Sequence, residues 1–472
     1  MNFNKKLAVA VSSAVLLMAG QFALADSTTD IVDALVSKGV LTEEEGKLIT
    51  KGSESKRKAD EKANKSRISV GSFIDNATMY GDIRARYERR DGDVIQTNGS
   101  TINSDSNRAR YKITFGLTTN SGKWYSDFAM AMGDNVRSDN TSFGDNATAG
   151  DSGNKTKSTL YAKRAMIGWN ATDWLAIEAG RMKNPLYMVN AMVFDHDIVV
   201  DGLNEKLKYT MGNTELFANL GQWVYDGKEV ASTNGGTTTT ARQNMLLAFQ
   251  AGARQSLSDS MSAKAAIGYY NYTANSTSLT PYIPTIGNAA GNAKNYAVND
   301  LAILDIPMEM NFMASSSIGI RPYAEYAYNT LGDERKNASG STVIGLANDD
   351  TAWLVGVSVG SAKDLKSFEG KKMKANDWLL NLWYQSVGAY ALDQNAVDSD
   401  IFDGRLNMEG TSLKAQYNIE DNVALNFTGA WGSRKNSQYG TMGPKNDIVT
   451  SSTNNNSIDN YNLYQFDVTY KF

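Results

Sequence analysis

Residues 108–117 have the sequence RARYKITFGL. Apolar and aromatic side chains occupy positions 109, 111, 113, 115 and 117, and basic residues and a threonine occupy 108, 110, 112 and 114. Successive side chains of a β-strand point to opposite faces, so a strand here has one apolar face and one polar face. The stretch predicts a strand that separates an apolar medium from water.

The same two-residue period runs from about residue 78 to the C-terminus. In the last stretch, 464–472, aromatic residues and a valine alternate with Gln, Asp, Thr and Lys. About sixteen such stretches can be distinguished, and bacterial outer-membrane barrels have an even number of strands. We therefore expect an all-β fold, a transmembrane antiparallel β-barrel of about 16 strands.

The links between these stretches alternate in length. Short, turn-like links such as 119–122 and 420–422 alternate with long polar segments, as the periplasmic turns and external loops of a barrel do. A lysine-rich link, 363–376, is long where a short turn is expected. The predicted external loops are 91–106, 133–158, 182–201, 226–242, 274–298, 331–350, 392–402 and 432–459.

The tryptophans suit a barrel in a bilayer, because indoles gather at both membrane interfaces. Trp124, Trp169, Trp174 and Trp378 lie beside short links, and Trp223, Trp353 and Trp431 lie toward long loops. A soluble β-sandwich would show the same alternation. At this length it would need two or more domains, and no change of composition follows residue 78.

The N-terminal region has a different character. Residues 1–25 combine Lys5 and Lys6 with an apolar stretch and the ending Ala23-Leu24-Ala25, which predicts a cleaved secretory signal peptide. Residues 26–74 show helix-capping patterns and alternating charges, and we expect a helical periplasmic extension there. The barrel is then expected at 75–472.

Composition excludes several classes of protein. The chain has no cysteine, so it has no disulfide and no thiol for metal or redox chemistry. Its net charge of −4 does not suit a nucleic-acid partner. The single histidine, His196, falls short of the ligand sets that zinc sites use, and we expect no metal, no cofactor and no catalytic residue. A barrel hydrolase (protease or lipase) and a structural anchor or adhesin are the alternative functions.

Several short motifs, in their order along the chain, resemble the putative porin family of Gram-negative bacteria and, more distantly, phosphate-selective and general porins. The motifs are DIVDAL at 30–35, KGVLT at 38–42, AGRMKNP at 179–185, DWL at 377–379, DSD at 398–400, DNVAL at 421–425 and VTYKF at 468–472. The resemblance covers nearly the whole mature chain. It implies passive diffusion of small solutes and ions across the outer membrane, embedding in its lipid and assembly as a homotrimer. The ending in Phe472 resembles the signal read by the barrel-assembly machinery.

Charged residues on the polar strand faces are candidates for the pore lining. The basic candidates are Arg84, Arg86, Arg108, Arg110, Lys112, Arg164, Lys206 and Lys208, and the acidic ones are Asp305, Glu309 and Glu325. Local pairing, for example with Asp82 or Glu88, would make these charges unremarkable. A segregated basic wall would instead bias which ions pass. We favour the second interpretation, which predicts an anion preference.

The segment 182–201 is too apolar for a loop in water, with Leu186, Tyr187 and Phe194 among its residues. In porins the loop after the fifth strand folds into the lumen, and the resemblance implies the same role here. Its acidic residues Asp195 and Asp197 would then form an acidic side of the constriction. They are expected to face Arg84, Arg86, Arg108 and Arg110.

Overall fold

The computed structural model describes residues 42, 74–96, 99–133, 138–144, 158–226, 230–234, 237–241, 244–273, 300–338, 349–361, 365, 373–441, 448 and 457–472. The chain divides into two compact units, Met1–Ser69 and Val70–Phe472. The predicted signal peptide lies outside the described residues. So does the predicted helical extension, apart from Thr42 and Ile74.

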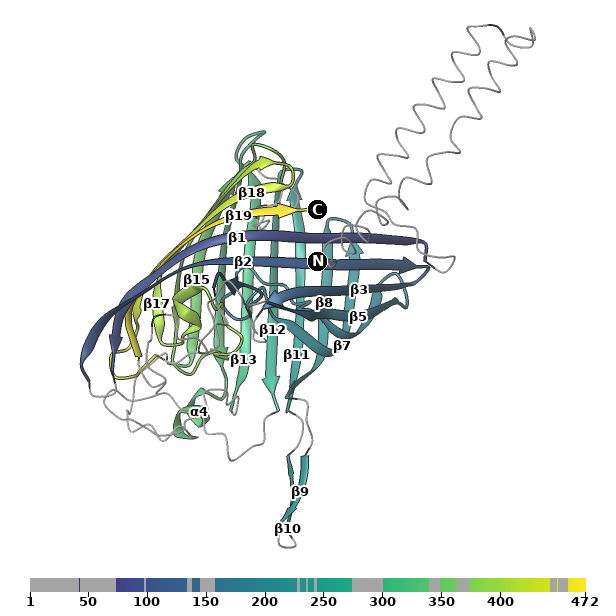
Figure 1. Ribbon diagram of the computed structural model, residues 1–472. Coiled ribbons are helices and arrows are strands. Elements are labelled where there is room, and N and C mark those ends of the chain that lie inside the picture. The colour runs from purple at the N-terminus through teal and green to yellow at the C-terminus, as the bar shows by residue number, and fades with distance from the viewer. Residues whose placement is uncertain are drawn as a thin grey trace, which may run out of the picture. The chain divides into compact units, whose positions relative to one another are not determined.

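The second unit is a closed antiparallel sheet, whose strands are seen from the side in Figure 1. Its long strands are β1 (Asn76–Ile95), β2 (Thr101–Ser121), β3 (Trp124–Gly133), β5 (Thr159–Asn170), β6 (Leu175–Lys183), β7 (Val199–Met211), β8 (Thr214–Asp226), β11 (Asn244–Ser258), β12 (Met261–Tyr272), β13 (Ala302–Met313), β14 (Gly319–Asn329), β15 (Thr351–Gly360), β16 (Trp378–Val387), β17 (Met408–Glu420), β18 (Val423–Arg434) and β19 (Ser457–Lys471). Each pairs with its neighbour in sequence, and β1 also pairs with β19. The predicted 16-stranded barrel is confirmed.

A few short elements accompany these strands among the described residues. They are β4 (Thr141–Ser142), which pairs with β2, the hairpin of β9 (Val230–Asn234) and β10 (Thr237–Ala241), the helix α4 (Gly332–Ala338) and the 3-10 helix η4 (Ile401–Gly404). In the part of the chain that the structure describes, no helix is long and apolar enough to cross a membrane.

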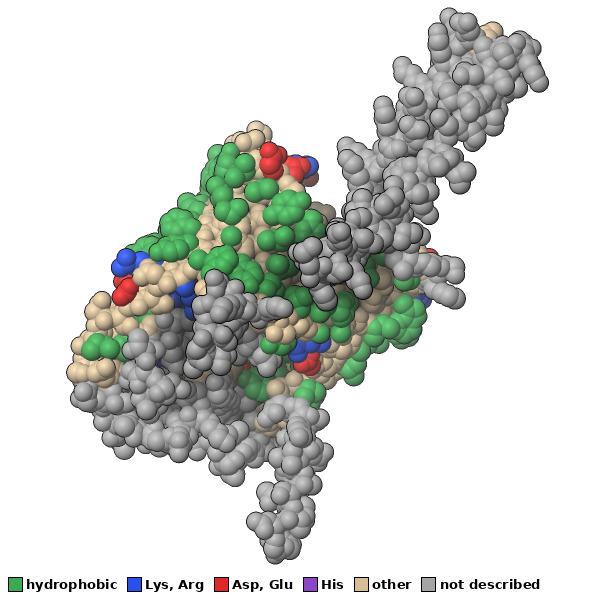
Figure 2. Space-filling view, viewed as in Figure 1, with side chains coloured by type: hydrophobic (Ala, Val, Ile, Leu, Met, Phe, Trp, Pro, Cys, Tyr) green, Lys and Arg blue, Asp and Glu red, His purple; other side chains and the backbone are tan. Residues whose placement is uncertain are grey.

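The strand alternation separates an outer apolar surface from an inner polar one. On β1, Ile83 and Tyr87 are about half exposed, whereas Arg84 and Arg86 are buried. Figure 2 shows hydrophobic side chains gathered over the outer wall. Exposed apolar side chains on nearly every strand would be costly in water, and they match the lipid-facing band of an outer-membrane barrel.

Tryptophans at the short-turn end lie on the outer surface as predicted. Trp124 and Trp169 are exposed and stack with their ring centroids 5.8 Å apart. The prediction for Trp223 is wrong, because this side chain is 1% exposed on the inner face of β8. The interior next to it is apolar, since the segment between β6 and β7 packs there. An indole can therefore be buried inside this part of the barrel.

The first predicted external loop, 91–106, is also wrong. β1 continues to Ile95 and β2 begins at Thr101, and Asp91 lies directly opposite Asp105 in the ladder. Most side chains of the hairpin are polar here, apart from Val94, Ile95 and Ile102, so the sequence loses its apolar alternation. Strand pairing depends on backbone hydrogen bonds, which the polar side chains leave intact.

Candidate functional site

A ladder of basic side chains covers the inner face of β1 and β2. Arg84 lies opposite Lys112 and Arg86 lies opposite Arg110, so the basic residues form adjacent rows. Arg84, Arg86, Arg110 and Lys112 are all nearly fully buried. Arg108 is about one quarter exposed. These five predicted pore-lining residues point inward, but most of them are covered by other parts of the chain.

β19 supplies the first set of carboxylate partners. Asp467 lies directly opposite Arg86, and the Arg86 guanidinium donates two hydrogen bonds to it, at 2.7 and 2.9 Å. Arg84 Nη1 lies 3.8 Å from the same carboxylate. A planar guanidinium matches a carboxylate in this two-bonded arrangement, which is among the stronger ionic contacts in proteins.

Glu88 is the second carboxylate within the ladder. It is fully buried and pairs with Arg90 at 3.3 Å and Arg110 at 3.8 Å. Arg108 also donates a hydrogen bond to it. The pairing of the basic residues with Glu88, which the sequence analysis left open, is therefore present. Basic side chains nevertheless outnumber acidic ones on the inner faces of these two strands.

The segment between β16 and β17, residues 388–407, folds into the barrel and reaches this ladder. Asp400 accepts hydrogen bonds from Arg86 at 2.9 Å and Arg90 at 3.1 Å. Asp403 accepts one from Arg90 at 3.2 Å. The hydroxyl of Tyr461 accepts another from Arg90 at 2.9 Å. We call residues 388–407 the ladder loop.

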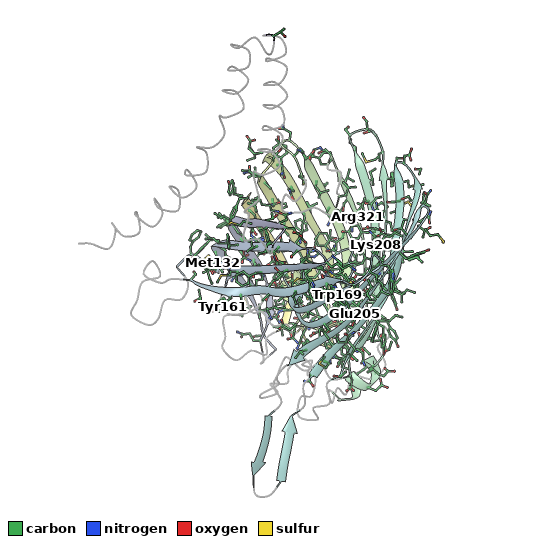
Figure 3. The ribbon with its side chains drawn as sticks, turned by 90° about the vertical axis from the view of Figure 1, so that its right-hand side faces the viewer. Met132, Tyr161, Trp169, Glu205, Lys208 and Arg321 are labelled. Carbon is green, nitrogen blue, oxygen red and sulfur yellow. The ribbon has the colours of Figure 1, made fainter. Side chains whose placement is uncertain are left out.

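The segment between β6 and β7, residues 184–198, also lies inside the barrel, and we call it the apolar loop. Gln250 on β11 accepts a hydrogen bond from the Tyr187 N–H at 2.7 Å and donates one to the Tyr187 carbonyl at 2.9 Å. The Phe194 ring meets Tyr270 of β12 edge to face, with centroids 5.2 Å apart. Arg321 on β14, labelled in Figure 3, donates to the Val189 carbonyl at 2.7 Å.

The two loops are hydrogen-bonded to each other. The Asp195 N–H donates to the Ala396 carbonyl at 2.6 Å, and the Ser399 N–H donates to the Asp195 carboxylate at 3.1 Å. Asp197 lies 3.6 Å from Lys163 of β5. Besides Asp467 and Glu88, the carboxylates beside Arg86 and Arg90 come from the ladder loop, which the sequence analysis did not predict. The described contacts of the apolar loop run to β11, β12 and β14 and, through Asp197, to β5.

A third inward segment, 138–141, follows β3. Asn140 accepts a hydrogen bond from Arg84 at 2.6 Å through its side chain and one from Arg110 at 3.0 Å through its carbonyl. Asp139 is paired with Lys163. Burial and the nearby Asp197 raise the pKa of the Asp139 carboxyl above its ordinary value, and Lys163 opposes that rise.

The other predicted basic residues lie along β5 and β7. Arg164 donates to Asp127 of β3 at 2.7 Å. Lys206 pairs with Glu178 of β6 at 2.7 Å and Lys208 with Glu215 of β8 at 2.6 Å. Lys206 and Lys208, the second of which is labelled in Figure 3, are more exposed than the ladder residues.

The predicted acidic residues lie on the opposite wall. Asp305 and Glu325 face inward and are buried, and Tyr270 donates a hydrogen bond to Asp305 at 2.9 Å. Glu309 pairs with Arg321 at 2.6 Å. Tyr270 also contacts Phe194, so these side chains lie beneath the apolar loop.

Residues 92–301 match a family model described as a putative porin. The chain is similar to this family over that stretch. It is an outer-membrane porin, a channel formed by a β-barrel. No curated protein matches the sequence.

Several solved porins are similar to this porin. OmpF of Salmonella typhi, in complex with daunomycin, is 11% identical over 86% of this chain and 100% of its own, with a TM-score of 0.43. An anion-selective porin from Comamonas acidovorans is 9% identical over 84% of this chain and 99% of its own, with a TM-score of 0.41.

The sequence did not single out Arg90, Asp400 and Asp403 as site residues of this porin. Arg90 continues the inward alternation of Arg84 and Arg86, and that pattern could have identified it. For the two aspartates, the signal was the set of apolar residues in the ladder loop, such as Leu392, Val397 and Phe402, the same kind of feature that pointed to the apolar loop.

His196 lies in an exposed turn of the apolar loop. Among the residues that the structure describes, no three His, Cys, Asp or Glu side chains are grouped so that they could hold a metal ion. Catalysis by a serine hydrolase needs a histidine held between a nucleophile and an orienting carboxylate. His196 is flanked in sequence by Asp195 and Asp197, whose contacts described above run to Ser399 and Lys163.

Proposed function

We propose that the porin passes small hydrophilic solutes and ions by passive diffusion through a lumen narrowed by the apolar loop. The observation that carries this proposal is the attachment of that loop to β11, β12 and β14 inside the barrel. An inward loop of this kind reduces the width available to solutes and excludes large ones. Charged side chains along the remaining passage would then act on ions at short range.

We also propose a weak anion preference. The support is the excess of basic side chains on the inner faces of β1 and β2, reinforced by Arg164, Lys206 and Lys208. The effect is expected to be modest, because Glu88, Asp467 and Asp400 neutralise much of the ladder.

Planar-bilayer recording tests both proposals. The purified porin should give discrete open steps, and a salt gradient at low ionic strength should give a zero-current potential of the sign expected for anions. Replacing Arg86 and Arg110 by glutamine should move that potential toward cations, and D195N with D197N should move it toward anions. Absence of steps would refute the channel, and an unchanged potential in both double variants would refute the assigned selectivity.

The porin is proposed to act without catalysis. The contacts of Asp195 and Asp197 support this, since they run to a backbone N–H and to Lys163. Hydrolysis of peptide or ester substrates that H196A abolishes would overturn the proposal.

Assembly is proposed to produce a homotrimer with the help of the barrel-assembly machinery. Phe472 exchanges two backbone hydrogen bonds with Gly81, at 3.0 and 3.1 Å, and so completes the β1–β19 seam. Deleting Phe472 should lower the yield of folded porin in the outer membrane while export continues. Chemical cross-linking of the native porin in membranes should give a trimer, and a monomer alone would exclude it.

A further inference from the structure

The ladder loop reaches two separated parts of the wall. It leaves β16 at Val387 and enters β17 at Met408. Asp393 accepts a hydrogen bond from Tyr225 of β8 at 2.9 Å, and Asp400 pairs with Arg86 of β1. Because β8 and β1 are far apart in the ring of strands, these contacts place the loop across the lumen.

The attachment at β1 is ionic and buried. Arg90 and Asp403 are both fully buried, and Arg86 is nearly so. Ion pairs withdrawn from water are directional and hold only when each charge keeps its partner. The Phe402 ring packs edge to face on Tyr461 of β19, with centroids 6.4 Å apart, and supports the same end of the loop.

The backbone of the ladder loop is in an unfavourable conformation at this attachment. Phe402, Asp403 and Asn407 have φ values of 52°, 60° and 60°. Residues other than glycine rarely adopt positive φ, and they keep it only where surrounding contacts fix them. Two of the three lie at the ionic contact, so loss of the ion pairs would allow the loop to relax away from β1.

Asp400 differs from the other members of this cluster because its side chain remains one quarter exposed. Its carboxylate therefore both holds the loop and presents negative charge to the solvent in the lumen. We propose that the ladder loop is a second constriction element of the porin, latched across the lumen by Arg86, Arg90, Asp400 and Asp403, and that Asp400 helps to determine which ions pass.

This inference rests on the proposed diffusion function, and single-channel recording of matched variants tests it. D400N with D403N should raise the open-channel conductance in concentrated salt, because the loop loses its latch, and should shift the zero-current potential toward anions. R86Q with R90Q should also raise conductance but shift the potential toward cations. If conductance rises in both double variants while their zero-current potentials shift in opposite directions, the rise comes from release of the loop and not from the change of charge.

The control is D91N with D93N. Like D400N with D403N, it removes two negative charges, but it removes them from β1. These two side chains are hydrogen-bonded to Asn462 and Asn460 of β19, away from the ladder loop. This variant should keep the conductance of the wild type. An equal rise in the control would overturn the latch.

A second measurement serves if R86Q with R90Q fails to fold, as judged by migration of the unboiled porin in detergent gels. The chain has no cysteine, so Ser399→Cys introduces a single thiol into the buried part of the ladder loop. A charged thiol reagent should label it faster when D400N and D403N are also present. Equal labelling rates and equal conductances would overturn the inference, whereas a wild type that never conducts would refute the proposed function itself.

Discussion

The two loops inside this barrel are held by different chemistry. The ladder loop is attached to β1 by buried ion pairs of Arg86 and Arg90 with Asp400 and Asp403. The apolar loop is attached to β11, β12 and β14 by ring contacts and by hydrogen bonds to its backbone. Both lie inside a barrel whose outer surface faces lipid.

The difference shows that chain segments inside a water-filled barrel can be buried in two ways. Apolar contacts are non-directional and tolerate small shifts, and each buried backbone group must still find a hydrogen-bond partner. Ion pairs repay the cost of leaving water only in good geometry, so they fix one arrangement of the loop. We therefore expect the ladder loop to be more precisely held and more sensitive to the loss of a single charge.

The largest effect is expected from Arg90→Met. It leaves the buried carboxylates of Glu88 and Asp403 without this cation, and removing one partner of a buried ion pair costs about 3–5 kcal/mol. Urea unfolding in detergent micelles measures the loss. The control is Arg89→Met on the outer face, where a surface change should stay within about 0.5 kcal/mol. If both variants lost the same free energy of unfolding, the inner ion pairs of β1 would matter no more than its outer surface.

Phe194→Ala should lower the free energy of unfolding of the porin by a somewhat smaller amount than Arg90→Met. The Phe194 ring is 2% exposed, and truncating a buried Phe costs about 3 kcal/mol. Because no charge is involved, the loss should not change between low and high salt. If the difference in unfolding midpoint between the wild type and Phe194→Ala changed strongly with salt, the attachment of the apolar loop would not be apolar.

Gln250→Leu should have an intermediate effect. It removes the two hydrogen bonds to Tyr187 and a third to the Tyr270 hydroxyl, and it leaves the Tyr187 N–H and carbonyl buried without this partner, which costs about 2 kcal/mol. Gln222→Leu on β8 is the control, since Gln222 hydrogen-bonds Glu205 and is less buried. The same urea assay compares the two, and an effect no larger than that of the control would count against the role of Gln250.

The smallest effect concerns Asp139, which joins the apolar loop to segment 138–141 through Lys163. Since burial and Asp197 raise the pKa of Asp139 in the folded porin, ionising it opposes folding above its ordinary pKa. Asp139→Asn should therefore stabilise the porin at neutral pH. The gain should shrink as the pH falls and the wild-type carboxyl takes up a proton. A gain that is constant with pH would show that the charge is not its cause.

Sequence patterns were sufficient where structure follows from local geometry. The alternation at 108–117 assigns Arg110 and Lys112 to the inside and Ile113 and Phe115 to the outside, and the structure agrees. The same rule failed to show where the hairpin of β1 and β2 ends, because most side chains there are polar and do not alternate with apolar ones. It also could not show that Trp223 faces an apolar interior, since the residues that make it apolar come from elsewhere in the chain.

The sequence by itself determined the barrel, its sixteen strands and the inward direction of the basic ladder. Each of these depends on the two-residue period of a strand and on the apolar surface that lipid requires. Only the tertiary structure decided that Asp400 and Asp403 meet the ladder. Arg86 and Asp400 are 314 residues apart. They meet because β19 closes the sheet against β1 and brings the segment after β16 over the same wall, a long-range condition that no local pattern of residues records.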